Sequence, residues 1–305
     1  MTTLFSLCFS AALFSASLQD ATSFVVKDAP RASSRCMATA VVETVEESMI
    51  QEARDMDPQI VESMPPPLPS DLKNKYYFLR HGLSTANVAE VISSDRSLAY
   101  SNRHGLTPKG YEQGMASAKE LLDALEEEGV AAGDKVVFLS SPFARAKQTA
   151  MACLDGLAEP ENQERLRNEF GDLEISSKIL MENRLMERYF GRLDNEAIYT
   201  YSYVWPLDKF NASHTAFDVE SVAAVCHRLS EVVERCESEF ENHHIVWVSH
   251  ADVLQIGQLY GANVENVGMF SSYRFKNGEV RAMKRTPDSL PDPVPLEAPL
   301  RGTNM

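Results

Sequence analysis

Length, composition and charge already exclude some classes of protein. The chain has 305 residues, 44% of them hydrophobic and 24% charged, which is an ordinary balance for a globular protein with a sizeable core. The formal net charge of −15 argues against a nucleic-acid binder, because no basic field exists to attract a phosphate backbone. If so acidic a protein handles phosphate esters, a few cations must be concentrated in one pocket.

The first 70 residues do not have the pattern of a folded domain. Residues 4–18 are apolar but too few to span a membrane, so we interpret residues 1–23 as a signal-peptide-like segment. Residues 24–70 begin as a basic, hydroxyl-rich stretch typical of a transit peptide and continue as an acidic, proline-rich stretch that we interpret as a linker or a peripheral arm rather than core. Ala21-Thr22-Ser23-Phe24 resembles the junction in bipartite plastid presequences of algae with secondary plastids. We therefore expect a plastid protein, with a secreted or endomembrane protein as the alternative.

Residues 71–285 alternate short apolar runs with helical stretches. Strands are predicted over residues 76–79, 135–140, 177–181 and 245–249, and helices over 107–128, 142–157, 218–241 and from 250 to about 260. Asn277-Gly278 predicts a hairpin within residues 270–283. The alternation predicts an α/β three-layer sandwich, with a mostly parallel sheet, helices on both faces and one antiparallel edge strand. Residues 286–305 form a proline-rich tail that we expect to be extended and loosely held.

Three of the predicted strands end in polar residues that can converge. Arg80-His81-Gly82 follows the first strand, a segment with Arg145 follows the second, and His250 follows the last. Right-handed crossovers place these ends on one rim of a parallel sheet, where ligands bind. A neutral imidazole is a good nucleophile toward phosphorus, and arginine can neutralise phosphoryl oxygens. A second copy, Arg103-His104-Gly105, has no strand before it and is interpreted as a loop.

Five motifs in order resemble the histidine phosphatase (phosphoglycerate-mutase-like) superfamily. They are Leu79-Arg80-His81-Gly82-x-Ser84-x-x-Asn87, Leu106-Thr107-Pro108-Lys109-Gly110-x-x-Gln113, Ser140-Ser141-Pro142-x-x-Arg145-Ala146-x-Gln148-Thr149-Ala150, Leu185-Met186-Glu187-Arg188-Tyr189-Phe190-Gly191 and Val248-Ser249-His250. Any one of them alone would be a weak signal, but five in register are a strong one. Two departures are Ala251, where the family usually has glycine, and Asp218, which changes the run before Glu220-Ser221.

The resemblance implies a role for each matching residue. His81 is expected to be the nucleophile, while Arg80, Arg145 and His250 bind and stabilise the transferring phosphoryl group. Glu187 is expected to protonate the leaving oxygen and then to activate water, with Glu182 as the alternative proton donor. The remaining substrate-binding residues implied by the motifs are Asn87, Ser84 and Arg188.

These roles predict a metal-independent phosphatase that hydrolyses a phosphate monoester, without metal or cofactor, through a phosphohistidine on His81. The expected ligand is a small phosphorylated metabolite; we expect neither nucleic acid nor, in the mature form, a membrane as partner. Mutases of the superfamily carry an arginine-rich insert after the acidic motif, whereas residues 195–206 contain no arginine, so water is the expected acceptor. The alternatives are mutase-type phosphoryl transfer, a phosphoprotein phosphatase and a non-catalytic interaction module.

Residues 199–205 have a period-two aromatic pattern. The alternating residues predict either a strand or an aromatic lid over a small substrate, and packing in the core is the favoured interpretation; they are Tyr199, Tyr201, Tyr203 and Trp205.

Overall fold

The computed structural model describes residues 41–42 and 47–295, all of which belong to the unit Met37–Met305. The signal-peptide-like segment and the basic stretch after it lie outside the described residues, and so does the end of the proline-rich tail. Over the residues that are described, the structure contains no helix both long and apolar enough to cross a membrane.

A six-stranded sheet forms the centre of the described unit, with strand order β1-β4-β3-β5-β2-β6. All neighbouring strands are parallel except β6, which runs antiparallel to β2 at one edge. The strands are β1 (Val41–Val42), β2 (Lys75–Arg80), β3 (Lys135–Ser140), β4 (Glu174–Met181), β5 (His243–Ser249) and β6 (Val280–Ala282). The predicted mostly parallel sheet with one antiparallel edge strand is confirmed.

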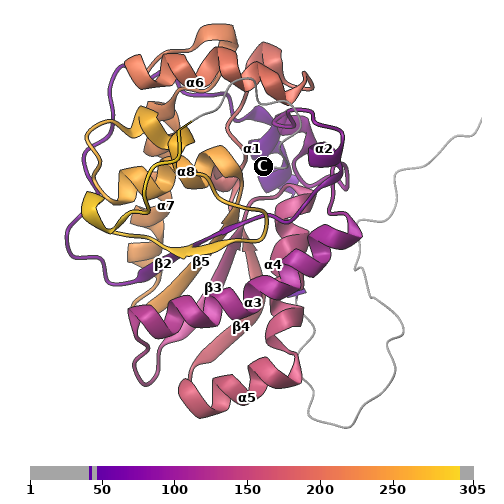
Figure 1. Cartoon of the computed structure of the whole chain (residues 1–305), viewed down its shortest axis with the longest axis vertical. Helices are drawn as coiled ribbons and strands as arrows, with labels where there is room; N and C mark the ends of the chain where they lie inside the picture. Colours follow the sequence, from indigo (N-terminus) through magenta and orange to yellow (C-terminus); the bar gives the residue numbers. More distant parts are fainter. Residues whose placement is uncertain (1–40, 43–46, 296–305) are drawn as a thin grey trace, which may run out of the picture. The chain divides into compact units, whose positions relative to one another are not determined.

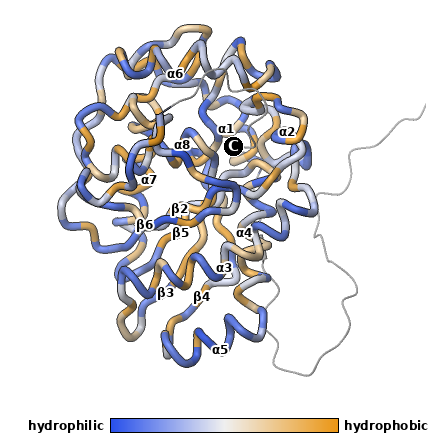
Figure 2. The backbone as a smooth tube through the Cα atoms, viewed as in Figure 1, coloured by the Kyte–Doolittle hydropathy of each residue, from blue (hydrophilic) through white to orange (hydrophobic). Residues whose placement is uncertain are grey.

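Helices cover both faces of this sheet (Figure 1). One face carries α3 (Pro108–Glu128), α4 (Ala144–Leu157) and α5 (Pro160–Glu169), and the other carries α7 (Val222–Glu239) and α8 (Ala251–Gly261). Alternate residues of β2 supply the two cores: Tyr76 and Phe78 pack with α7 and α8, whereas Tyr77 and Leu79 pack with α3 and α4. The apolar middle of β3, residues 136–139, is coloured as hydrophobic in Figure 2.

The start of α3 fixes the loop that follows β2. Thr107 caps the helix by accepting a hydrogen bond from the Gly110 backbone N–H at 3.0 Å, and Pro108 is the first helical residue, as predicted. A Cβ atom on Gly82 would lie 2.2 Å from the Gly110 carbonyl oxygen, and one on Gly110 would lie 2.1 Å from the carbonyl oxygen of Leu83. Two glycines thus allow the loop to contact the helix backbone, which places the residue before Gly82, His81, at the end of the sheet.

Several predicted elements differ from those observed. The helix expected from Asp218 begins at Val222, because Ser221 caps it by accepting from the Ala224 N–H at 3.0 Å. The expected hairpin is wrong: β6 pairs with β2, and Val267–Ser272 form a 3₁₀ helix. Neither α5 nor the short helices α1 (Glu47–Asp55) and α2 (Thr85–Val88) was predicted.

Part of the stretch that we interpreted as a linker belongs to the folded unit. β1 pairs with β4. Ala53 of α1 is fully buried, and Met64 and Leu68 pack against the core formed with α7 and α8. The Tyr260 hydroxyl donates a hydrogen bond to the Pro66 carbonyl oxygen at 2.6 Å. The linker interpretation is therefore wrong for the described residues before 71, which bury apolar surface.

The described part of the tail is also held in place. Leu290 packs against the same core, and the Val294 backbone N–H donates to the Ser272 carbonyl oxygen at 2.7 Å. Pro291, Asp292 and Val294 line the large cavity described below. The tail is therefore anchored at Leu290 and Val294, although the other residues of 286–295 are exposed.

Candidate active site

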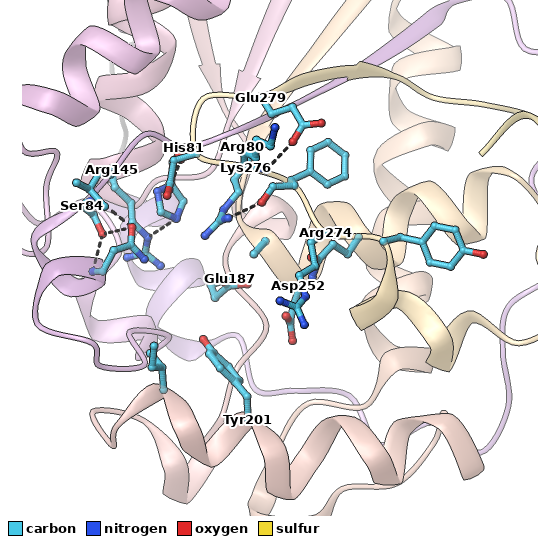
Figure 3. Close-up of a pocket in the computed structure, with 18 of the residues that line it drawn as sticks. Arg80, His81, Ser84, Arg145, Glu187, Tyr201, Asp252, Arg274, Lys276 and Glu279 are labelled. Atoms are coloured by element: carbon cyan, nitrogen blue, oxygen red, sulfur yellow. Dashed lines mark hydrogen bonds between the residues drawn. The ribbon is translucent and has the colours of Figure 1, made fainter. Parts of the chain in front are cut away.

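A cavity of about 690 Å³ brings together most of the residues that the motifs predicted. Its wall includes six of them, namely Arg80, His81, Ser84, Asn87, Arg145 and Glu187. They come from the end of β2 and the loop and short helix α2 after it, from the first turn of α4 and from the loop after β4 (Figure 3). His250 lies directly behind this wall, with its ring centre 5.2 Å from that of His81.

His81 is held so that one ring nitrogen is available for reaction. Its Nδ1 lies 2.8 Å from the Gly82 carbonyl oxygen, a contact that requires Nδ1–H as the donor in a neutral ring and leaves the lone pair on Nε2. Burial lowers the pKa of His81 well below its usual 6.5, and the charges of Arg145 and Arg80 lower it further. The imidazole is therefore neutral at neutral pH, as nucleophilic attack requires.

Arg145 connects the two histidines. Its Nε lies 3.3 Å from His81 Nε2 and 3.1 Å from His250 Nδ1, and its two terminal nitrogens donate to Ser93, to Oγ at 3.2 Å and to the carbonyl oxygen at 2.7 Å. Burial lowers the pKa of Arg145 to about 10, so the guanidinium remains charged at neutral pH. His104, from the second copy of the tripeptide, lies in a loop as expected, but its Nδ1 is 2.7 Å from Ser93 Oγ.

Arg80 and His250 are also fixed by neighbouring groups. A terminal nitrogen of Arg80 donates to the Phe275 carbonyl oxygen at 2.5 Å. His250 Nε2 lies 2.8 Å from the Ser141 hydroxyl, and burial followed by the charge of Arg145 lowers its pKa well below 6.5. Two cations and the neutral imidazole of His81 thus converge at one end of the cavity, with His250 held behind them against Arg145, so that the cations can contact the oxygens of a phosphoryl group.

Glu187 has the environment of a proton donor. It is 7% exposed, its Oε1 accepts from the Arg188 backbone N–H at 3.0 Å, and its Oε2 lies 4.0 Å from His250 Nδ1. Burial raises its pKa, and the positive charges of Arg145 and Arg80 only partly oppose this. A carboxyl group that holds its proton at higher pH than usual suits general acid catalysis.

The alternative donor, Glu182, does not line the cavity. Its carboxylate forms ion pairs with Arg184 and Arg235, both at 2.8 Å. Burial raises its pKa, but the hydrogen bonds and charge of Arg184, followed by the charge of Arg235, outweigh burial and lower it. Glu182 is thus held ionised and away from the phosphoryl end, and this geometry argues against its role as the proton donor.

Arg188 requires a correction. Its side chain is fully buried, donates to both carboxylate oxygens of Asp208 at 2.7 and 2.8 Å, and donates through Nε to the Glu220 carbonyl oxygen at 2.7 Å. It is absent from the cavity wall. The expected substrate contact at Arg188 is therefore wrong, because its donors are committed to the protein itself.

Ser84 and Asn87 both line the cavity and also form hydrogen bonds with each other. Ser84 caps α2, and both its backbone N–H and its hydroxyl donate to Asn87 Oδ1, at 3.0 and 2.9 Å. The Asn87 Nδ2 group has no partner among the residues that the structure describes, so it is the available donor of this pair.

Other residues of the cavity wall were not predicted as site residues. Asp252 and Gln255 of α8 belong to it, and so do Tyr201 and Trp205 of α6 (Tyr201–Phe210). The aromatic pattern did contain a signal: Tyr201 and Trp205 are four residues apart and share a helix face, whereas the intervening Tyr203 is half-exposed. The strand interpretation of this segment is wrong, and its inner face covers the cavity.

This geometry agrees with a comparison against known families. The family model described as "Histidine phosphatase superfamily (branch 1)" matches residues 76–180 and 173–290. The chain therefore belongs to the histidine phosphatase superfamily. No curated protein matches it significantly.

Comparison with solved structures gives several matches at low sequence identity. One is "Mycobacterial hydrolase 1", with a TM-score of 0.51 and 14% identity over 68% of this chain and 90% of the other. A mycobacterial glucosyl-3-phosphoglycerate phosphatase gives a TM-score of 0.49 and 16% identity, and the match covers 68% of this chain and 91% of the phosphatase. The α-ribazole phosphatase of Shigella flexneri gives a TM-score of 0.46 and 19% identity, and the match covers 73% of this chain and 99% of the phosphatase. At these identities the likeness concerns the fold alone.

Proposed function

We propose that this protein hydrolyses a phosphate monoester through a phosphoryl group held transiently on His81 Nε2. The observation that carries the proposal is the contact of Nδ1 with the Gly82 carbonyl oxygen at 2.8 Å, together with the low pKa of the ring. These two features leave Nε2 unprotonated, with its lone pair beside the guanidinium of Arg145, whose Nε donates to it at 3.3 Å.

The reaction has two steps that mirror each other. In the first, Nε2 attacks phosphorus, the bond between phosphorus and the ester oxygen breaks, and Glu187 gives its proton to the leaving oxygen. In the second, the Glu187 carboxylate takes a proton from water while the water oxygen attacks phosphorus and the P–N bond breaks. Arg80, Arg145 and His250 stabilise the charge on the phosphoryl oxygens in both steps.

The uncharged side chains that α6 and the turn before it place in the cavity wall support water as the acceptor. From residues 195–206 the cavity wall includes Ile198, Tyr201 and Trp205, none of which can retain a second anionic group by charge. A mutase must hold its doubly phosphorylated intermediate while it turns over, so hydrolysis is the outcome that this segment favours.

The test is turnover of an aryl phosphate by the full chain, without added metal and with a chelator present. Wild type and His81→Ala would be compared, with His227→Ala as the control, because His227 is half-buried on α7 away from the cavity and its Nε2 lies 3.1 Å from the Ser63 carbonyl oxygen. We expect metal-independent release of phosphate that falls by about two decades or more in His81→Ala and stays unchanged in the control. Equal rates in all three, or interconversion of phosphoglycerates by wild type, would contradict the proposal.

A further inference from the structure

A second group of polar side chains lies in the same cavity, apart from the cations that surround the phosphoryl end. Asp252 and Gln255 are each 3% exposed, and both line the cavity. They are three residues apart in α8, so their side chains lie on one face of that helix. Tyr201 of α6 lines the cavity as well, and in Figure 3 its hydroxyl points toward Glu187. We call Tyr201, Asp252 and Gln255 the distal group.

The hydrogen bonds of the distal group are incomplete. One oxygen of Asp252 accepts from Trp205 Nε1 at 3.2 Å and lies 3.6 Å from a terminal nitrogen of Arg188. The other oxygen, like the whole amide of Gln255, has no partner in the part of the chain that the structure describes. These atoms are not sealed from the cavity, so a ligand that enters it can complete their hydrogen bonds.

Gln258, one turn further along the same helix, shows the contrast. It is as buried as Gln255, but its Nε2 donates to the Tyr273 carbonyl oxygen at 2.6 Å and its Oε1 accepts from Arg281 at 3.1 Å. Gln258, which faces the protein, thus has its hydrogen bonds completed by neighbouring residues. Gln255, which faces the cavity, does not. The open donors and acceptors are therefore specific to the cavity side.

Size and charge indicate what these groups would bind. The cavity of about 690 Å³ is much larger than a phosphoryl group needs, so there is room for the alcohol part of an ester. Asp252 and Gln255 bring no positive charge to this end of the cavity, while carboxyl and amide oxygens accept hydrogen bonds from hydroxyl groups. Trp205, stacked on Tyr201 with ring centres 4.6 Å apart, adds apolar surface suited to carbon–hydrogen groups.

Resting on the proposed function, we propose that the distal group binds the leaving alcohol, and that this alcohol is an uncharged polyol, as in a sugar or sugar-alcohol phosphate. Asp252 and Gln255 accept or donate hydrogen bonds to its hydroxyls while His81 reacts at the phosphoryl end. Arg274, which also lines the cavity, can donate to a hydroxyl in the same way. Lys109 and Lys276 are exposed where they line the cavity and represent the competing possibility, an anionic leaving group.

The test compares two esters of equal carbon number, sorbitol 6-phosphate and hexyl phosphate, with 3-phosphoglycerate as an anionic ester. We expect wild type to have the highest kcat/KM for sorbitol 6-phosphate. Asp252→Asn and, separately, Gln255→Leu should lower that value about tenfold or more, and change kcat/KM for hexyl phosphate less than threefold. Asp172→Asn, in an exposed loop, is the matched control and should change neither.

A binding measurement separates this proposal from the proposed function. Calorimetry with His81→Ala, which lacks the nucleophile, should show sorbitol 6-phosphate binding more tightly than hexyl phosphate, and Asp252→Asn in that background should remove the difference. Equal loss for both esters in the variants, or tighter binding of 3-phosphoglycerate, would overturn the distal group as a polyol site. Failure of the proposed function would appear instead as turnover that does not depend on His81.

Discussion

The two reacting residues have pKa values that their surroundings shift in opposite senses. Burial and two neighbouring cations lower the pKa of His81, which keeps the nucleophile neutral, whereas burial raises the pKa of Glu187, which favours the protonated form of the acid. Pairs of titratable groups separated in this way are typical of sites that need a base and an acid at one pH.

The pH dependence of kcat/KM follows from these two directions. Activity requires His81 without its proton, so it should persist below pH 6.5 and decline only at the lowered pKa of that residue. It also requires Glu187 with its proton, so it should fall as the pH rises through the raised pKa of Glu187. Glu187→Gln should lower kcat by roughly two to three decades and remove the alkaline decline.

Asp252 is the other group that could cause the alkaline decline, because burial raises its pKa to about 7. Profiles would be corrected for ionisation of the substrate phosphate and measured for wild type, Glu187→Gln and Asp252→Asn. An alkaline decline that survives in Glu187→Gln but disappears in Asp252→Asn would assign the proton to Asp252 and contradict our account.

At the scale of elements, Arg188 joins three segments around the active site. Its ion pair with Asp208 reaches α6, its bond to the Glu220 carbonyl oxygen reaches the start of α7, and His214 Nε2 contacts the same aspartate at 2.7 Å. Charge and hydrogen bonds from Arg188 and His214 lower the pKa of Asp208 against the effect of burial. This pair therefore stabilises the fold above the unfolded pKa of Asp208, and the contribution is lost as the pH falls toward the lowered value.

Arg188→Met should therefore reduce stability more than it changes phosphate binding. Removing the cation leaves Asp208 buried without its main partner, and we expect a loss of about 3–5 kcal/mol in the free energy of unfolding. Urea unfolding at pH 7 measures this, with Arg167→Met on the exposed side of α5 as the control. An unchanged midpoint together with a large rise in KM would instead restore Arg188 as a substrate-binding residue.

The elements that the sequence predicted well have signals that are local. β2, β3 and β5 are continuous buried runs, and α3 begins at a Thr-Pro cap, so neighbouring residues suffice to recognise them. α5 buries only Leu166 and has almost no apolar stripe. The strand pairing of residues 280–282 depends on β2, two hundred residues earlier in the chain, and no turn motif reveals it.

The same distinction applies to the site. His81, Arg145 and Glu187 lie in motifs at the ends of strands, so their type and spacing indicate their chemistry. Asp252 and Gln255 are ordinary polar residues of a buried helix until the fold places them against the cavity. The substrate-binding role predicted for Arg188 was wrong because a motif shows a residue's type and spacing but not its partner. That partner is Asp208, which lies in α6.

At the scale of the whole molecule, the proline-rich tail is part of the cavity. Removal of residues 286–305 would take away Pro291, Asp292 and Val294 and open one side of the site. We expect KM for phosphate esters to rise about threefold to tenfold, close to 1 kcal/mol of binding free energy, with a smaller change in kcat. Steady-state kinetics of full-length and truncated chains test this, and an unchanged KM in a folded truncated chain would contradict it. The plastid location stays a prediction.

The central claim is that His81 carries the phosphoryl group, and trapping that species tests it most directly. Glu187→Gln would be mixed with the aryl phosphate, quenched in denaturant at alkaline pH, where phosphohistidine survives, and examined by intact and peptide mass spectrometry. Our account predicts one phosphoryl group per chain, located on His81 and absent from His81→Ala. Continued turnover by wild type with no phosphorylated chain in any variant, or a phosphoryl group on another residue, would contradict it.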